Sequence, residues 1–480
     1  MTGTPDKKTY VEELTDQGDD FSRWYNEVVR KAQLADYTPV RGSMVIRPYG
    51  YALWENMQQR LDRRIKATGH QNAYFPLLIP ESLLQLEADH VDGFAPQVAW
   101  VTHGGNDKLE ERYCIRPTSE AIICHMYSRW IESYRDLPVL INQWANVMRW
   151  EKVTRLFLRT AEFLWQEGHT AHATETEAME EVLRMLEVYR DFVENDLAMP
   201  VWPGRKSDAE KFAGASATFS IEALMRDGKA LQAGTSHFLG QHFAKVFDIT
   251  FQDEHGKRQH VYQTSWGVST RLIGGLVMTH GDDQGLRMPP RVAPIQAVVI
   301  PIWRKDEDRV SVMEFIDRVK EALGESVRLH VDARDQYTPG WKYNEYELRG
   351  VPVRLEVGPK DVANRAVMSV RRDSRAKESI PLAELAQRLP VLLDQIQNGM
   401  FEAALKFRDE NTAFCPTLEA LEAHFASKRG YAAVPWDGDA RFEAEVKART
   451  MATMRCMPLD QSRFASEAGG RPWALFARSY

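Results

Sequence analysis

Residues 149–169 read RWEKVTRLFLRTAEFLWQEGH, and the charges in this stretch indicate its chemistry. Arg149 and Glu151 lie two positions apart, so a strand would present both side chains on one face. With a short loop between them, Arg149 and Arg159 could bracket a polyphosphate. An ordinary salt bridge on a strand is the alternative for Arg149 and Glu151.

Clusters of polar residues and glycines lie on both sides of this stretch. Upstream, Thr118 and Glu120 place a hydroxyl and a carboxylate at an expected helix start, where they could hold the two hydrogens of a cationic amine. Capping of the helix N-terminus is the alternative for this pair. Downstream, QAGTSH at 232–237 and SWGVSTRLIGG at 265–275 contain glycines that let the backbone approach a ligand, and the second adds an arginine at an expected helix start. A structural histidine is the alternative for His237.

The composition is that of a folded protein of several domains without a strongly basic surface. At about 150 residues per domain, 480 residues predict roughly three domains. Hydrophobic residues make up 44% and charged residues 27%, which excludes wholesale disorder. The net charge of -7 excludes a generic basic nucleic-acid binder, so a nucleic-acid partner would be held by local patches.

The cysteines and the N-terminus predict a cytoplasmic protein. The polar, acidic start of the chain indicates neither a signal peptide nor a transit peptide. No apolar run approaches the roughly 18 residues that span a bilayer, so no membrane partner is expected. Too few and too scattered for a disulfide scaffold, the cysteines are Cys114, Cys124, Cys415 and Cys456.

Three prolines between positions 289 and 294 predict a domain boundary. We expect a first domain over 1–288, a second over 289–400, and a separate small α+β module over 401–480. In the second domain strands and helices alternate, which predicts an α/β fold with a mostly parallel sheet.

Hydrophobic periodicity predicts the individual elements. In the first domain we expect helices over 51–66 and 174–198 and a short strand over 74–79. The strands expected in the second domain cover 297–302, 327–331, 351–357 and 366–371, and the helices cover 306–323, 343–349 and 382–401.

Taken together, the clusters resemble the three motifs of class II aminoacyl-tRNA synthetases, specifically of the prolyl-tRNA synthetases of the archaeal and eukaryotic-like type. The strings FLRTAEFLWQEGHTAH, GTSHFLGQHFAKVFDITF and HGDDQGLRMPPRVAP are similar to that family almost letter for letter, and the resemblance covers nearly the whole chain. Neither the class I signatures HIGH and KMSKS nor a GxxxxGK[ST] phosphate loop occurs. The segments that match motifs 1, 2 and 3 are Gly69…Pro76, Arg149-x-Glu151…Arg159 and the glycine-rich segment ending in Arg271-x-x-Gly274.

The resemblance implies a fold, a reaction and partners. The fold would be an antiparallel-sheet α+β catalytic domain, an α/β anticodon-binding domain and the C-terminal module. The reaction would be ATP-dependent attachment of L-proline to tRNA(Pro), with prolyl-adenylate formed first and the prolyl group then transferred to the tRNA 3′ end. Mg²⁺ would bridge the ATP phosphates, and motif 1 would form a homodimer interface. A non-catalytic tRNA-binding paralogue is the alternative.

The same resemblance assigns roles to individual residues. Arg149 and Arg271 would be catalytic, because they would neutralise the reacting anions. The implied proline site consists of Thr118, Glu120, Arg149, Phe163, Trp165, His169, His237, Ser265 and Gly267. The implied ATP site consists of Arg149, Glu151, Arg159, Thr160, Gln232, Thr235, Ser269, Thr270 and Arg271.

Three residues of the second domain would read anticodon bases: Lys342, Arg349 and Glu356. Unstacked bases need donors and acceptors for their edges, which these side chains supply. A solvated helix face is the alternative.

The C-terminal module is expected to lack zinc. Many members of the family carry four zinc-binding cysteines there, one after a tryptophan, whereas Trp436 is followed here by Asp437. Cys415 and Cys456 alone do not make a tetrahedral site. The tail that ends in Tyr480 would either pack in its own module or reach toward the catalytic domain.

Overall fold

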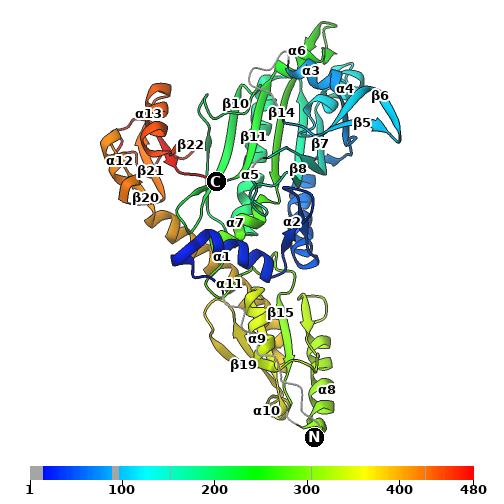
Figure 1. Ribbon diagram of the computed structural model, residues 1–480, viewed down its shortest axis with the longest axis vertical. Helices are drawn as coiled ribbons and strands as arrows, with labels where there is room; N and C mark the ends of the chain where they lie inside the picture. Colours follow the sequence, from blue (N-terminus) through cyan, green and yellow to red (C-terminus); the bar gives the residue numbers. More distant parts are fainter. Residues whose placement is uncertain (1–13, 89–96, 152, 304, 428) are drawn as a thin grey trace.

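The structure is a computed structural model that describes residues 14–88, 97–151, 153–303, 305–427 and 429–480. Its main feature is an 11-stranded sheet in the order β20-β21-β23-β22-β9-β10-β11-β14-β8-β7-β3 (Figure 1). The first domain contributes α1 (Gln17–Lys31), β1 (Ala35–Tyr37), β2 (Met44–Ile46), α2 (Pro48–Ala67), β3 (Gln71–Asn72), β4 (Leu78–Pro80), α3 (Glu81–Ala88), β5 (Trp100–Gly104), β6 (Asp107–Ile115), α4 (Glu120–Trp130), a 3-10 turn (Tyr134–Asp136), β7 (Val139–Met148), β8 (Glu162–His172), α5 (Glu175–Asn195), β9 (Val201–Arg205), β10 (Ala217–Leu224), β11 (Ala230–Gly240), α6 (His242–Val246), β12 (Thr250–Gln252), β13 (Arg258–His260), β14 (Tyr262–Ser269) and α7 (Arg271–His280).

Antiparallel pairing joins the strands from β9 to β7 in this sheet, as the resemblance implies. Helix α5 packs on one face of it against β11 and β14. The helix begins with a capping box between Thr174 and Glu177, and its buried residues recur at helical spacing at Ala178, Val182 and Met185. The expected helices over 51–66 and 174–198 are therefore confirmed as α2 and α5. Helix α5 does not cover the opposite face of the sheet, which carries the cavity described below.

The strand expected over 74–79 is wrong for most of its length, because no strand covers residues 73–77. Only its end belongs to β4. The Phe75 backbone N–H donates to Gln143 Oε1 at 2.5 Å rather than to a neighbouring strand. Pro76 has no N–H to donate, so this segment could not complete a strand ladder.

The second domain is built on a five-stranded sheet in the order β16-β15-β17-β18-β19. Its two parallel pairs, β15 with β16 and with β17, are followed by two antiparallel pairs. The expected mostly parallel sheet is therefore wrong, since the connections around β18 are too short for a crossover. The elements are β15 (Ala297–Pro301), α8 (Asp306–Leu323), β16 (Leu329–Val331), α9 (Pro339–Leu348), β17 (Val353–Val357), α10 (Pro359–Asn364), β18 (Ala366–Arg371), β19 (Lys377–Pro381) and α11 (Leu382–Glu410).

The C-terminal segment is not separate from the first domain. Helix α11 runs past the expected end at 401 and connects the second domain to this segment (Figure 1). Strand β22 then pairs with β9, with Met457 opposite Arg205, so the C-terminal strands extend the central sheet. Its elements are β20 (Thr412–Phe414), α12 (Leu418–Ser427), β21 (Tyr431–Pro435), α13 (Ala440–Thr450), β22 (Thr453–Pro458) and β23 (Trp473–Ala477). No helix in the described part of the chain has the length and apolar character of a membrane span.

Candidate active site

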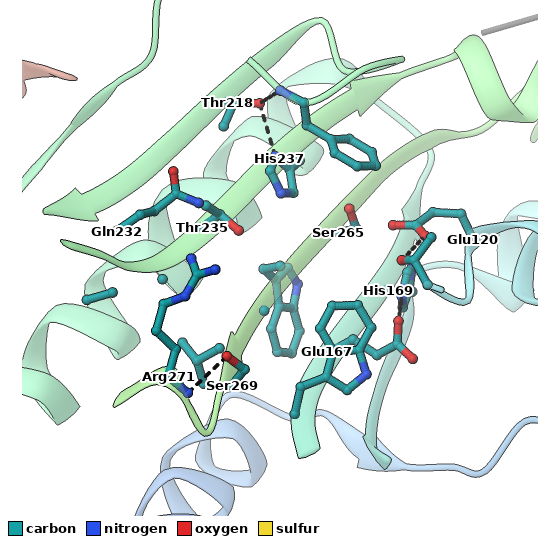
Figure 2. A pocket seen from close by; sticks show the side chains of 18 of the residues that line it. Glu120, Glu167, His169, Thr218, Gln232, Thr235, His237, Ser265, Ser269 and Arg271 are labelled. Carbon is teal, nitrogen blue, oxygen red and sulfur yellow. Dashed lines mark hydrogen bonds and ion pairs between the residues drawn. The ribbon is translucent and has the colours of Figure 1, made fainter. Parts of the chain in front are cut away.

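A cavity of about 260 Å³ lies on the open face of the central sheet, over β8, β11 and β14 (Figure 2). Its walls come from the start of α4, the end of β7 and the start of α7. The residues from the sequence analysis that line it are Thr118, Glu120, Arg149, Phe163, Trp165, His169, Gln232, Thr235, His237, Ser265, Gly267, Ser269 and Arg271. The fold thus brings all four sequence clusters to one place.

Strand register sets the floor of the cavity. Glu167 and His169 are two positions apart on β8, so both face the same side of the sheet. Antiparallel pairing with β14 places Gly267 opposite Glu167 and Ser265 opposite His169. Pairing with β11 places His237 opposite Ser265. The floor therefore alternates between charged groups and small residues, which leave room for a ligand.

One end of the floor carries a buried ion pair. His169 Nε2 lies 3.0 Å from Glu167 Oε2, while Ser119 Oγ and Gln143 Nε2 donate to Glu167 Oε1 at 2.5 and 2.8 Å. Burial alone would raise the pKa of Glu167, but its bonds, first to His169, lower it. Burial alone would lower the pKa of His169, but the bond to Glu167 and the charge of Glu120 raise it. The surroundings favour the charged form of both groups.

Glu120 adds a second carboxylate at this end. It opens α4, lines the cavity and lies beside His169 (Figure 2). Thr118 Oγ1 donates to its carboxylate. Ser119 stands at the N-cap position without a side-chain capping bond, because its hydroxyl donates to Glu167 instead. Helix capping is therefore not the role of this segment, and the carboxylate of Glu120 suits a bound cation.

His237 forms an uncharged part of the wall. Its Nδ1 lies 3.0 Å from Thr218 Oγ1, and the Phe212 ring packs against it with centroids 4.8 Å apart. Burial, together with the nearby charge of His169, lowers the pKa of His237 to about 3. The imidazole is therefore neutral near pH 7 and can donate or accept a hydrogen bond without adding charge.

Two guanidinium groups line the rest of the cavity. Arg149 lies 5.5 Å from the ring centroids of both Phe163 and Trp165, and its Nε donates to a backbone carbonyl at 3.0 Å. Arg271 Nε donates to the backbone carbonyl of Leu158 at 3.2 Å, and Figure 2 shows its guanidinium close to Gln232 and Thr235. Neither arginine forms an ion pair with another described residue. The charges of Glu120, Glu167 and Glu151 act on Arg149 without a direct ion pair, and enclosed cations without a direct ion pair favour an anionic ligand.

Four residues assigned to ATP lie outside the lining of the cavity. Glu151 and Arg159 form an ion pair at 2.7 Å in the loop between β7 and β8. Strand β7 ends at Met148, so the expectation that Arg149 and Glu151 share a strand face is wrong. Thr160 Oγ1 donates to a backbone carbonyl at 2.7 Å, and Thr270 is the N-cap residue of α7.

Sequence reasoning assigned no role to nine residues that line the cavity, four of which lie within the quoted glycine-containing clusters: Ala233, Gly234, Trp266 and Val268. Glu167 could have been inferred from its alternation with its neighbours on β8. Thr218 is on β10, and only the strand register places it opposite His237. Glu210, Lys211 and Phe212 come from the connection between β9 and β10, where no pattern indicates a site.

The three residues assigned to the anticodon all make contacts within the chain. Tyr337 and Trp341 stack nearby with ring centroids 3.7 Å apart, and Arg334 lies over both rings. A freely solvated helix face does not describe the three assigned residues. Their contacts are Lys342 Nζ with the Asp332 backbone oxygen, Arg349 with Glu345 and Gln33, and Glu356 with Arg354.

The described residues contain no group of three or more His, Cys, Asp or Glu side chains placed to hold a metal ion. All four cysteines are buried and form no disulfide. A Mg²⁺ ion does not need such a group, because it retains several waters and binds through nucleotide phosphates with one or two protein oxygens.

Family models match three parts of the chain. Residues 100–280 match the tRNA synthetase class II core domain (G, H, P, S and T), residues 296–392 match the anticodon binding domain, and residues 418–480 match the prolyl-tRNA synthetase C-terminal domain. The three matches correspond to the first-domain strands of the central sheet, to the second domain and to the C-terminal segment.

Comparisons with relatives over nearly the whole chain indicate the same family as the family models. The proline--tRNA ligase of Natranaerobius thermophilus is 58% identical and that of Rubrobacter xylanophilus 57% identical, over 96% and 98% of this chain and 94% and 99% of theirs. A prolyl-tRNA synthetase from Cryptosporidium parvum, solved with halofuginone and AMPPNP, is 42% identical, with a TM-score of 0.91 over 97% of this chain and 99% of its own. The chain therefore belongs to the prolyl-tRNA synthetase family of class II aminoacyl-tRNA synthetases.

Proposed function

We propose that this chain is a proline--tRNA ligase that works in two steps. In the first, a carboxylate oxygen of L-proline attacks the α-phosphorus of ATP, and prolyl-adenylate and pyrophosphate form. In the second, a hydroxyl at the 3′ end of tRNA(Pro) attacks the prolyl carbonyl carbon, and AMP leaves. The observation that carries this proposal is the cavity itself, in which Glu120 supplies a carboxylate while Arg149 and Arg271 lack ion-pair partners among the described residues.

The acidic end would hold the proline imino group. Glu120 and Thr118 supply a carboxylate and a hydroxyl, and the neutral His237 completes the wall without repelling the cationic nitrogen. Phe163 and Trp165, whose ring centroids are 6.0 Å apart, offer an apolar surface for the proline ring.

The cationic end would hold the reacting anions. Arg149 is suited to bridge the proline carboxylate and the α-phosphate, two like charges that repel each other. Arg271, with Gln232 and Thr235 beside it, is suited to the rest of the nucleotide (Figure 2). The Glu151–Arg159 ion pair would separate when ATP binds, so that both side chains contact the nucleotide. Mg²⁺ would bind together with the phosphates.

The second domain would bind the anticodon stem-loop. Lys342, Arg349 and Glu356 remain the proposed readers, and the Tyr337–Trp341 stack offers an aromatic surface for an unpaired base. Tyr74 in the motif 1 segment and Leu78 just after it are exposed, which supports the expected homodimer. The cytoplasmic location and the absence of zinc remain predictions, and metal analysis of the purified protein checks the second.

Pyrophosphate exchange with each of the twenty amino acids tests the proposed activity. We expect ATP–pyrophosphate exchange that depends on proline far more strongly than on any other amino acid. Exchange that no amino acid stimulates would favour a non-catalytic tRNA-binding paralogue. Intact Arg149, Arg159 and Arg271 argue against that alternative.

A further inference from the structure

A buried group of three charged side chains lies next to the cavity and has no part in the reaction described above. Glu222 on β10 is fully buried between Lys206, which follows β9, and Arg455 on β22. Its Oε1 accepts from Lys206 Nζ at 2.7 Å and from Ser220 Oγ at 2.9 Å. Its Oε2 accepts only from Arg455 among the described residues, at 3.0 Å. We refer to Lys206, Glu222 and Arg455 as the charge network.

Strand geometry places the charge network on the same face of the sheet as the cavity. Thr218 and Glu222 are four positions apart on β10, so both side chains face the same side. Thr218 lines the cavity. Across the strand pair the register partner of Glu222 is Gln232, which also lines the cavity, next to an irregularity between Ile221 and Glu222. The network therefore borders the wall formed by Gln232 and Arg271.

The charges of the network act on Arg271. Burial and the charges of Arg149 and Arg159 lower the pKa of Arg271, while the carboxylate of Glu222 acts in the opposite direction. The Arg455 guanidinium acts in the same direction as the other arginines. If Oε2 of Glu222 lost its partner, it would therefore attract the Arg271 side chain, which forms no ion pair of its own within the described residues, although Lys206 would still bind Oε1.

We propose that Arg455 is a positioning residue for the nucleotide end of the cavity. Arg455 binds Oε2 of Glu222 and thereby prevents that carboxylate from binding Gln232 or Arg271. The side chains of Gln232 and Arg271 therefore remain free to contact ATP. The C-terminal segment thus contributes to the active site through β22, whose pairing with β9 brings Arg455 to Glu222. This inference rests on the proposed binding of ATP beside Gln232 and Arg271.

Substitution of Arg455 followed by steady-state pyrophosphate exchange tests the proposal. In Arg455→Met, which keeps the length of the stem but not the charge, we expect the KM for ATP to rise at least about fivefold, roughly the effect of one displaced charged contact. The KM for proline should change less than about twofold. Arg455→Lys should return the KM for ATP toward the wild-type value, because an ammonium still occupies Oε2.

Arg463→Met is the matched control, since Arg463 belongs to the same segment and pairs with Asp409 away from the cavity. It should leave both KM values unchanged. If Arg455→Met lowers only kcat and the melting temperature, or behaves like Arg463→Met, the positioning role is wrong. If Arg455→Met does not fold, Arg455→Gln replaces it. That variant must likewise raise the KM for ATP and leave the KM for proline nearly unchanged. Absence of exchange in the wild type would instead contradict the proposed activity.

Discussion

Two groups of charged side chains share one face of the central sheet and are organised in opposite ways. In the cavity, Arg149 and Arg271 have no ion-pair partners among the described residues and face a space large enough for a ligand. In the charge network, Glu222 has a partner on each carboxylate oxygen and is fully buried. The difference separates charges kept for substrates from charges that hold the fold together.

The physical reason is the cost of burial. An enclosed charge without a partner is unfavourable, so the folded protein bears that cost only where a ligand later supplies the counter-charge. A buried charge with partners costs less, but removal of one partner leaves the others uncompensated. Substitutions in the cavity should therefore change activity, and substitutions in the charge network should change stability, with Arg455 also affecting the KM for ATP as proposed above.

The largest expected effect is on catalysis. Arg149→Ala should lower the rate of proline-dependent pyrophosphate exchange by about 10²–10³-fold, because one group that stabilises developing charge is typically worth that much. Its melting temperature should stay close to the wild-type value, because Arg149 has no ion pair with another described residue to lose. Near-normal exchange in this variant would contradict the assignment of Arg149.

The second effect is on stability. Glu222→Gln leaves Lys206 and Arg455 buried without a counter-charge, and we expect the free energy of unfolding to fall by about 3 kcal/mol or more. Glu443→Gln is the control, since Glu443 is also buried but, among the residues that the structure describes, accepts only from Ser207 Oγ, at 2.8 Å. Urea denaturation measures both variants. Equal losses in the two would show that the charge network is no more than an ordinary polar contact.

The tail tests whether a contact outside the cavity influences it. Tyr480 donates to Asp227 Oδ2 at 2.5 Å, and its ring lies 5.5 Å from the guanidinium of Arg155 in the β7–β8 loop. Deletion of Ser479 and Tyr480 should lower pyrophosphate exchange several-fold with little change in melting temperature, because the loop loses this contact. Tyr480→Phe, which keeps the ring, should lose less. Unchanged activity with reduced stability would make the tail a packing element only.

The smallest expected effect is a pH dependence from His169. Its pKa is raised in the folded state, so its stabilising contribution is complete below the unfolded pKa of about 6.5 and is lost as the pH rises through the folded pKa. The difference in unfolding free energy between wild type and His169→Gln should therefore be larger at pH 6 than at pH 8. A difference that grows with pH would mean that the imidazole is buried uncharged.

Much of the site could be predicted because many of its residues lie a few positions apart in the sequence. From Phe163 to His169, every second side chain of β8 faces the cavity, and this alternation can be read from the order of the residues. Helix α7 begins at Arg271 as expected. The long helices could be predicted from periodicity and from the capping box at Thr174. Each of these features depends on residues a few positions apart.

The remaining features depend on contacts between distant segments. The position of Thr218 beside His237 and of Glu222 beside Gln232 follows from the β10–β11 register, which includes an irregularity that no local pattern indicates. The pairing of β22 with β9 joins residues far apart in the chain, so the role of Arg455 was not visible in the sequence. The same limit explains why the C-terminal segment was expected to stand alone.

Binding of a non-hydrolysable prolyl-adenylate analogue, followed by thermal melting, tests whether the charge of Arg149 serves the substrates. The analogue supplies the anion that the unpaired guanidinium groups lack, and a ligand stabilises the folded state in proportion to the logarithm of its concentration over its Kd. We expect a large rise in the melting temperature of the wild type and little or none for Arg149→Ala. An equal rise in both proteins would contradict the claim that the unpaired charge of Arg149 is kept for the substrates.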